Sequence, residues 1–261
     1  MGSPCPGEFV SVAHRLADAS GAVIRPHFRS NLAIEDKSDD SPVTIADKAA
    51  EREIRTLLER TYPKHGILGE EFGAQDTGNE FLWVLDPIDG TRSFICGVPA
   101  FTTLIALLRD GEPILGVIDQ PISGERWVGA IGHGTTLNGT AVTVREHRPL
   151  SQATMFTTTP EMFEARDTPA YNRLWAASHL TRFGLDGYAG GLLAAGQIDL
   201  HVEGTMNVWD YMALVPVIEN AGGIMTDWQG NRLTLDAGDG LTLAATGTAL
   251  HQEAMTILNG A

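Results

Sequence analysis

Apolar residues recur at helical spacing in the first quarter of the chain and in strand-like runs after it. Residues 9–28 carry apolar side chains three and four positions apart, which predicts an amphipathic helix that Pro26 bends or ends. A second helix is predicted for residues 44–60, capped by its first residue. Between them, residues 32–35 are predicted to form a short strand and residues 37–42 a polar loop.

Short apolar runs bounded by turn residues follow the two helices. They predict strands at residues 66–70, 81–85, 102–108, 114–120 and 125–131. Glycine-containing turns join the last three, which predicts an antiparallel meander. Gly129, Gly132 and Gly134 have the wrong spacing for a dinucleotide-binding fingerprint and no helix follows them, so they are predicted to be turns around a hairpin.

From about residue 150 the pattern changes to alternating helices and strands. Helices are predicted at residues 170–177, 187–195, 208–220 and 248–258, and strands at 179–182, 199–202, 224–227 and 241–245. Pro216 predicts a kink in the third helix, and Gly222-Gly223 predicts its end. The change of pattern predicts an α/β protein with two lobes, residues 9–149 and 150–261, and a site between them.

The most informative stretch is residues 86–91, Asp-Pro-Ile-Asp-Gly-Thr, directly after a predicted buried strand. Two carboxylates three residues apart at the end of a strand can converge on one hard cation. Gly90 and Thr91 suit the start of a helix, where free backbone N–H groups and the helix dipole attract an anion. The stretch therefore predicts a site where a metal ion meets a phosphate. The alternative is a surface loop with two solvated aspartates, because Asp-Pro and Asp-Gly are common in turns.

The charge of the chain narrows its function further. Its 261 residues include 18 Lys and Arg and 33 Asp and Glu, which gives a formal net charge of −15. No nucleic-acid partner is expected, because binding to a phosphate backbone needs a basic surface. A phosphate ester that approaches so acidic a protein needs local positive charge, and bound divalent cations would supply it.

The sequence also bears on the compartment. No apolar run approaches the length of a membrane span, and residues 1–8 lack the basic start and apolar core of a signal peptide. Cys5 and Cys96 are the only cysteines; they are not expected to pair, and Cys96 is predicted to be buried. These features predict a cytoplasmic protein without a membrane partner.

Residues 86–91 resemble the signature of the inositol monophosphatase family of metal-dependent phosphatases. Three further motifs are similar to that family in order and spacing: Gly69-Glu70-Glu71, Trp209-Asp210 and Gly222-Gly223. The resemblance extends from about Phe9 to the last predicted helix. It implies a layered αβαβα sandwich with mixed sheets, a phosphatase that hydrolyses a small phosphate monoester with water, and a homodimer.

The candidate metal ligands are all oxygen donors, which favours Mg²⁺, with Mn²⁺ as a possible substitute. They are the side chains of Glu70, Asp86, Asp89 and Asp210 and the backbone carbonyl of Ile88. The resemblance implies that Glu70 and Asp86 hold one ion together with Ile88. It implies a second ion between Asp86, Asp89 and Asp210, and two or three ions in all. Without the resemblance, a solvated strand end is the favoured interpretation of Glu70, and an ordinary helix cap is the alternative for Asp210.

The nucleophile is expected to be water, because no Ser or Cys lies in a convincing pattern with a base and an orienting acid. The resemblance implies that Thr91 and Asp47 activate this water and that Gly90, Thr91 and the following backbone hold the phosphate. It also places Lys37 near the metal loop. The alternative for Asp47 is an ordinary acid in the first turn of a helix. The 8 histidines show no spacing typical of a metal site and are expected at or near the surface.

The substrate is predicted from residues 182–203. Glu203 matches a substrate-contacting glutamate of the family, and Asp186 resembles the histidinol-phosphate phosphatase branch. That branch usually has Gly before this Asp and Cys-Tyr after it, whereas Leu185 and Gly187-Tyr188 stand here. Two carboxylates in the pocket favour a substrate with an ammonium group.

The favoured reaction is hydrolysis of L-histidinol phosphate to L-histidinol and phosphate, a step of histidine biosynthesis. The alternatives are inositol phosphate or a broad range of sugar phosphates. An alternative of another class is a non-catalytic regulator that binds a metal or a phosphorylated ligand. For Asp186 the alternative is a cap on the helix predicted to begin at Gly187.

Overall fold

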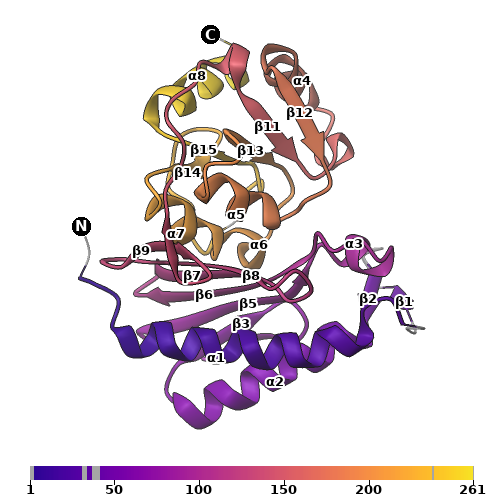
Figure 1. The fold of residues 1–261 in the computed structure, drawn as a ribbon, viewed down its shortest axis with the longest axis vertical. Helices are drawn as coiled ribbons and strands as arrows, with labels where there is room; N and C mark the ends of the chain where they lie inside the picture. The colour runs from indigo at the N-terminus through magenta and orange to yellow at the C-terminus, as the bar shows by residue number, and fades with distance from the viewer. Residues whose placement is uncertain (1–2, 31–33, 37–41, 237, 261) are drawn as a thin grey trace.

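The computed structural model describes residues 3–30, 34–36, 42–236 and 238–260. Helices and sheets are stacked in five layers, in the order helix, sheet, helix, sheet, helix (Figure 1). Both sheets mix parallel and antiparallel pairs. The predicted αβαβα sandwich with mixed sheets is therefore confirmed.

The larger sheet has eight strands in the order β10-β9-β8-β7-β6-β5-β3-β4. They are β3 (Gly66–Gly69), β4 (Gly73–Gln75), β5 (Phe81–Asp89), β6 (Thr102–Arg109), β7 (Glu112–Gln120), β8 (Glu125–Ala130), β9 (Gly134–Leu137) and β10 (Thr140–Val142). The β6–β7–β8 meander is antiparallel, as predicted, whereas β3 and β5 are parallel. The strand predicted for residues 81–85 continues to Asp89, because the backbone of the signature stays in the sheet.

Two helices, α1 (Gly7–Ile24) and α2 (Ile45–Thr61), cover the outer face of this sheet (Figure 1). Their apolar stripes are buried, as the helical spacing predicts. The first helix ends before the predicted residue 28, because Pro26 belongs to a separate 3-10 turn, Arg25–His27.

A two-stranded sheet of β1 (Ile34–Asp36) and β2 (Pro42–Thr44) lies beside the start of α2. Thr44, the predicted N-cap of α2, belongs to β2 in the structure. Lys37 lies outside the described residues.

The smaller sheet has the order β12-β11-β13-β15-β14. Its strands are β11 (Thr154–Thr157), β12 (Leu180–Phe183), β13 (Leu200–Glu203), β14 (Ile224–Asp227) and β15 (Thr242–Ala245). Helices α4 (Thr168–Ala177) and α8 (Thr248–Leu258) cover its outer face (Figure 1). The sequence did not predict β11, a short run with only two buried side chains, Met155 and Thr157.

Three short helices fill the layer between the sheets: α5 (Tyr188–Ala194), α6 (Val208–Tyr211) and α7 (Leu214–Glu219). The single helix predicted for residues 208–220 is wrong, because it breaks at Met212 and Ala213. In a continuous helix the ring of Pro216 would meet the carbonyl of Met212, four residues earlier. The break therefore precedes the proline by one turn.

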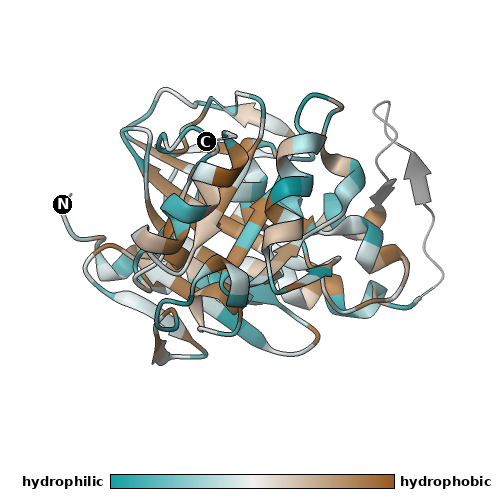
Figure 2. Ribbon diagram, turned by 90° about the horizontal axis from the view of Figure 1, so that it is seen from above, coloured by the Kyte–Doolittle hydropathy of each residue, from teal (hydrophilic) through white to brown (hydrophobic). Residues whose placement is uncertain are grey.

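The middle layer lies very close to the larger sheet at α7. A Cβ atom on Gly116 would lie 2.0 Å from the carbonyl oxygen of Ala213, and one on Gly129 would lie 2.4 Å from that of Pro216. Hydrophobic residues gather in the interior strands and helix faces (Figure 2). Glycine at these two positions of β7 and β8 is therefore a packing requirement.

Two further features bear on the sequence predictions. Of the helices in the described part of the chain, none is long and apolar enough to cross a membrane. Both cysteines are free; Cys5 is buried, but Cys96 is exposed. The prediction that Cys96 is buried is wrong, because it ends the short surface helix α3 (Thr91–Ile95).

The close approach of α7 predicts the effect of Gly116→Ala. The added methyl would displace backbone atoms, and we expect a loss of about 1–3 kcal/mol of unfolding free energy, the range for overpacked cores. Urea unfolding followed by circular dichroism measures this. Gly78→Ala is the control, because a Cβ there meets no heavy atom within 4 Å. Equal stability of the two variants would contradict the packing argument.

Candidate active site

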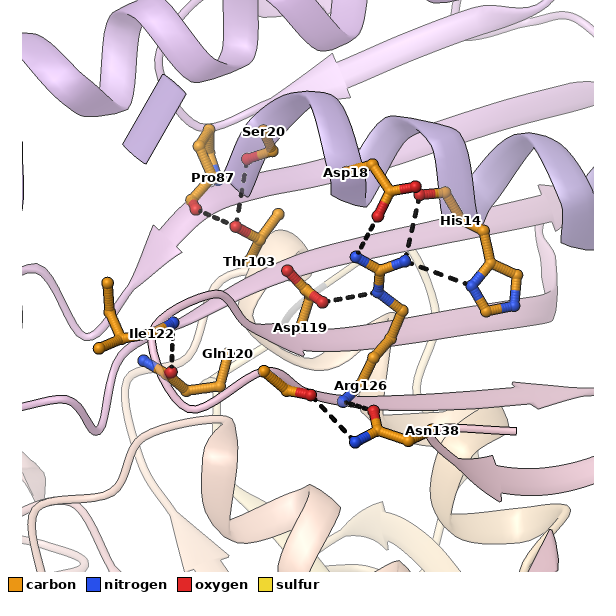
Figure 3. A network of polar contacts seen from close by, with 11 residues as sticks. His14, Asp18, Ser20, Pro87, Thr103, Asp119, Gln120, Ile122, Arg126 and Asn138 are labelled. Atoms are coloured by element: carbon orange, nitrogen blue, oxygen red, sulfur yellow. Dashed lines mark hydrogen bonds and ion pairs between the residues drawn. The ribbon is translucent and has the colours of Figure 1, made fainter. Parts of the chain in front are cut away.

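The signature residues lie on an irregularity at the end of β5. The register between β5 and β6 shifts between Asp86 and Asp89. Thr103 of β6 donates its hydroxyl proton to the carbonyl oxygen of Pro87 at 2.7 Å. Because that proton is used, the hydroxyl of Ser20 in α1 donates to Thr103, at 3.2 Å (Figure 3). The bulge between the two aspartates is thus supported from behind by buried hydroxyls.

A second polar network holds α1 in place at this support. Arg126 of β8 donates to Asp119 of β7 at 2.6 Å and to Asp18 of α1 at 2.8 Å (Figure 3). The guanidinium therefore joins α1 to two strands of the sheet. Its contact on α1, Asp18, is less than one helical turn from Ser20.

Asp89 is oriented from two sides. The Thr102 hydroxyl donates to Asp89 Oδ2 at 3.2 Å, and the backbone N–H of Gly187 donates to the same oxygen at 2.6 Å. A Cβ atom on Gly187 would lie 2.6 Å from this oxygen, so the contact requires glycine. Asp89 therefore joins the larger sheet to the start of α5.

Asp210 reaches the same place from α6. Asn207 is the N-cap of this helix, and its N–H donates to Asp210 Oδ2 at 2.7 Å in a capping box. One carboxylate oxygen each from Asp86, Asp89 and Asp210 lie within 4.8 Å of one another. Capping and participation in the carboxylate cluster occur together, as the position of Asp210 at a helix start predicts.

The cluster is electrostatically unfavourable without a cation. Burial raises the pKa of Asp86 well above its usual range, and the charges of Glu70, Asp89 and Asp210 raise it further. Burial likewise raises the pKa of Asp210 to about 7, against the hydrogen bond from Asn207. Oδ1 of Asp86 is buried and has no hydrogen-bond partner within the described part of the chain. Oxygen donors with this excess of negative charge fit a hard divalent cation.

Glu70 lies at the edge of the cluster and is fixed through its neighbours. Its N–H donates to the Leu85 carbonyl at 3.2 Å, and its charge raises the pKa values of Asp86 and Asp210. Glu51, fully buried in α2, accepts the N–H groups of Glu71 at 2.8 Å and Phe72 at 3.2 Å. The carboxylate of Glu51 thus shapes the turn that presents Glu70.

The candidate water-activating and phosphate-binding residues lie beside the cluster. Asp47, in the first turn of α2, is 1% exposed and raises the pKa of Asp86. The hydroxyl of Thr91 donates to the Ile88 carbonyl at 3.0 Å. Gly90 precedes α3 with φ +83°, a conformation that favours glycine. The Thr91–Asp47 pair and the Ile88 carbonyl as a ligand stay predictions.

Asp186 and Glu203 form a second acidic pair next to the cluster. Burial and the charge of Glu203 raise the pKa of Asp186 to about 6, although His201 and the hydroxyl groups of Thr158 and Ser93 act to lower it. The N-cap of α5 is Gly187, so Asp186 lies one residue before the capping position, and its alternative role as a cap stays a prediction. Its carboxylate lies against Gly90, where a Cβ would be 2.8 Å from Oδ2.

Several of these residues line a cavity. It has a volume of about 670 Å³, and its lining includes Gly90, Thr91, Asp186 and Asp210. A smaller cavity of about 100 Å³ adjoins it, with Asp89 and Glu203 in its lining. The volume suits a small molecule.

The sequence did not predict several residues that shape this site. Thr102, Thr103, Thr158 and Glu51 have no signal in their local sequence, because their partners are distant in the chain. His201 is 1% exposed and bonds Glu203, which corrects the expectation that the histidines lie near the surface. The only signal in the sequence was that positions 201 and 203 are two residues apart, the spacing of side chains on one face of a strand.

Comparison with known proteins agrees with this geometry. A family model described as the inositol monophosphatase family matches residues 6–259. The chain is 46% identical over 258 residues to the chloroplastic bifunctional phosphatase IMPL2 of Arabidopsis thaliana, covering 96% of this chain and 75% of the relative. It is 37% identical over 237 residues to a histidinol-phosphatase of Chlorobaculum parvum, covering 90% and 91%. The solved structure of an inositol monophosphatase from Zymomonas mobilis matches with a TM-score of 0.89 and 43% identity, covering 97% and 98%.

The raised pKa values predict that Mg²⁺ binding releases protons. At pH 6, Asp210 with its pKa of about 7 is largely protonated, and a cation must displace that proton. Calorimetric titration at pH 6 in buffers of different ionisation enthalpy is expected to show release on the order of one proton or more. The release should fall and the affinity rise toward pH 8.5. Binding without any dependence on the buffer at pH 6 would contradict the prediction.

Proposed function

The chain belongs to the inositol monophosphatase family and is a phosphomonoesterase, and from this premise we propose that it hydrolyses L-histidinol phosphate with Mg²⁺ as cofactor. The observation that carries the proposal is the pair Asp186 and Glu203 in a cavity wall next to the carboxylate cluster. An anionic ester whose other end is cationic is the substrate that best matches this distribution of charge.

The metal part of the proposal rests on the donor set. Asp86, Asp89 and Asp210 would hold Mg²⁺, with Glu70 and the Ile88 carbonyl completing the coordination of two or three ions. Mn²⁺ is a possible substitute, because it accepts the same donors. When bound, the ions would supply positive charge to the phosphate and lower the pKa of water.

The residues of the chain would position and deprotonate the attacking water. The Thr91 oxygen keeps lone pairs that can accept a proton from water while its own proton is donated. In the proposal the Thr91 hydroxyl turns from the Ile88 carbonyl, to which it donates at 3.0 Å, toward Asp47, which receives the proton that Thr91 passes on. Gly90, Thr91 and the following backbone of α3 would orient the phosphate oxygens.

Recognition of the rest of the substrate would fall to Asp186 and Glu203. One oxygen of Glu203, Oε2, is buried and has no hydrogen-bond partner among the described residues, so we propose that it accepts from an ammonium group. The name of the Chlorobaculum parvum relative agrees with histidinol phosphate. The name of the Zymomonas mobilis structure favours inositol phosphate, which is the alternative together with a broad range of sugar phosphates.

The proposal includes a cytoplasmic homodimer that takes part in histidine biosynthesis. Two unpaired cysteines support a reducing compartment. A regulator that binds a phosphorylated ligand without hydrolysis is the rival of another class. It has no need for a water-activating pair, so the test of Thr91 and Asp47 below separates the two.

The first test is release of inorganic phosphate from a panel of monoesters. We expect L-histidinol phosphate to have the highest kcat/KM, activity to vanish in excess chelator and activity to return with Mg²⁺. The reason is that the carboxylate cluster cannot bind a phosphate without a cation. Undiminished hydrolysis in excess chelator, with no metal detected in the protein, would refute the metal mechanism.

Thr91→Ala and Asp47→Asn are expected to lower kcat by about 10²–10⁴-fold if the pair acts as the base. Mg²⁺ affinity, measured by calorimetry, should change far less than in Asp86→Asn, which removes a central carboxylate. The double variant should be little worse than either single variant, because the two residues act as one unit. Multiplicative losses would show that they act independently.

Asp186→Asn is expected to lower the kcat/KM ratio of the amine-bearing ester to inositol phosphate. A charged hydrogen bond contributes about 1.5–3 kcal/mol, so the ratio should fall roughly ten- to a hundred-fold. Glu161→Gln is the matched control, because it removes a carboxylate from the rim of the same cavity. Equal losses for both esters, or a parent preference for inositol phosphate, would overturn the histidinol assignment and leave the general phosphatase.

A further inference from the structure

His201 lies directly behind the proposed recognition carboxylate. It precedes Glu203 by two positions in β13, so both side chains are on the same face of the strand. His201 is 1% exposed and Glu203 is 2% exposed. The ring nitrogen Nε2 lies 2.8 Å from Glu203 Oε1. A buried histidine in this position is outside the catalytic machinery described above.

The hydrogen bonds of Glu203 are all on one of its two oxygens. Oε1 accepts from the backbone N–H of Thr158 at 2.8 Å and from its hydroxyl at 3.2 Å, in addition to the His201 ring. Oε2 is buried and has no partner in the described part of the chain. A buried carboxylate oxygen without a donor is unfavourable, so this arrangement is suited to a ligand that brings one.

We propose that His201 is a positioning residue for substrate selection: it fixes Oε1 of Glu203 so that Oε2 faces the cavity and accepts a hydrogen bond from the cationic end of the substrate. This inference rests on the proposed function, because it explains how that site distinguishes an amine-bearing ester from a neutral one.

The geometry gives His201 a role that Thr158 cannot fill alone. Both Thr158 donors come from the residue directly after β11, whereas the histidine ring approaches from the same strand as Glu203. Donors from two directions prevent rotation of the carboxylate about its terminal bond, which is otherwise soft. Nδ1 of His201 is buried and has no partner in the ranges that the structure describes, where the hydrogen bond to Glu203 is the one that orients the ring.

The test compares two substitutions that differ in one donor. His201→Leu retains apolar bulk without an N–H, and His201→Gln retains an amide N–H that can reach Glu203. We expect His201→Leu to raise KM for L-histidinol phosphate roughly ten-fold, the loss of about one oriented hydrogen bond, with kcat changing much less. His201→Gln should recover most of this loss. Inositol phosphate is the reference ester, and thermal unfolding reports stability.

A second comparison asks whether His201 acts through Glu203. In the Glu203→Gln background, His201→Leu should have little further effect on the ratio of kcat/KM for the two esters. An unchanged ratio in His201→Leu alone, equal losses for both esters, or a full effect in the Glu203→Gln background would each overturn the inference. His201→Phe replaces the leucine variant if the latter does not fold.

Failure of the proposed function is distinguishable from failure of this inference. If the parent protein has no preference for the amine-bearing ester, the histidinol assignment fails and the inference falls with it. If the parent and Asp186→Asn behave as expected but His201→Leu keeps the parent ratio, only the role of His201 is refuted. Calorimetric binding of L-histidinol to the same variants checks the result independently of turnover.

Discussion

Mutual repulsion among buried carboxylates is the constraint on which the rest of this structure depends. Burial and four acidic neighbours raise the pKa of Asp86. Burial and acidic neighbours also raise the pKa values of Asp89 and Asp210. Such groups separate or take up protons unless the fold holds them and a cation compensates them. The hydrogen bonds around the site are best understood as the means of holding them, since each reaches a carboxylate or the backbone next to one.

The holding contacts come from three different layers. The outermost helix provides Ser20 to Thr103, the larger sheet provides Thr102 to Asp89, and the middle layer provides Gly187 and Asn207. This convergence requires the middle layer to approach the sheet closely, which glycines in β7 and β8 permit. The packing between layers and the geometry of the carboxylates are therefore coupled. A substitution that moves the layers apart would also move the carboxylates.

Local features of this protein could be predicted from the sequence, whereas long-range partners could not. The period of the apolar residues predicted the helices and the meander, and residues 86–91 indicated the carboxylate cluster, because both signals are confined to short stretches. The single helix predicted for residues 208–220 was wrong, since Pro216 acts on a carbonyl one turn earlier and the helix breaks there. Glu51 accepts hydrogen bonds from Glu71 and Phe72, which only folding brings close, and His201 contacts Glu203 within one strand, at a spacing that every strand contains. Nothing in their immediate neighbours distinguishes them from ordinary helix and strand residues.

The proposed recognition site and the carboxylate cluster meet at two consecutive residues. Asp186 lies against Gly90 and faces Glu203, and the next residue, Gly187, bonds Asp89. Asp186 has φ +46°, a left-handed conformation that Asp and Asn tolerate better than other side chains. Substitution by alanine or leucine would therefore strain the backbone that holds Asp89 and disturb both functions together. Asparagine preserves shape and backbone while removing the charge, so only that substitution separates recognition of a cation from the integrity of the carboxylate cluster.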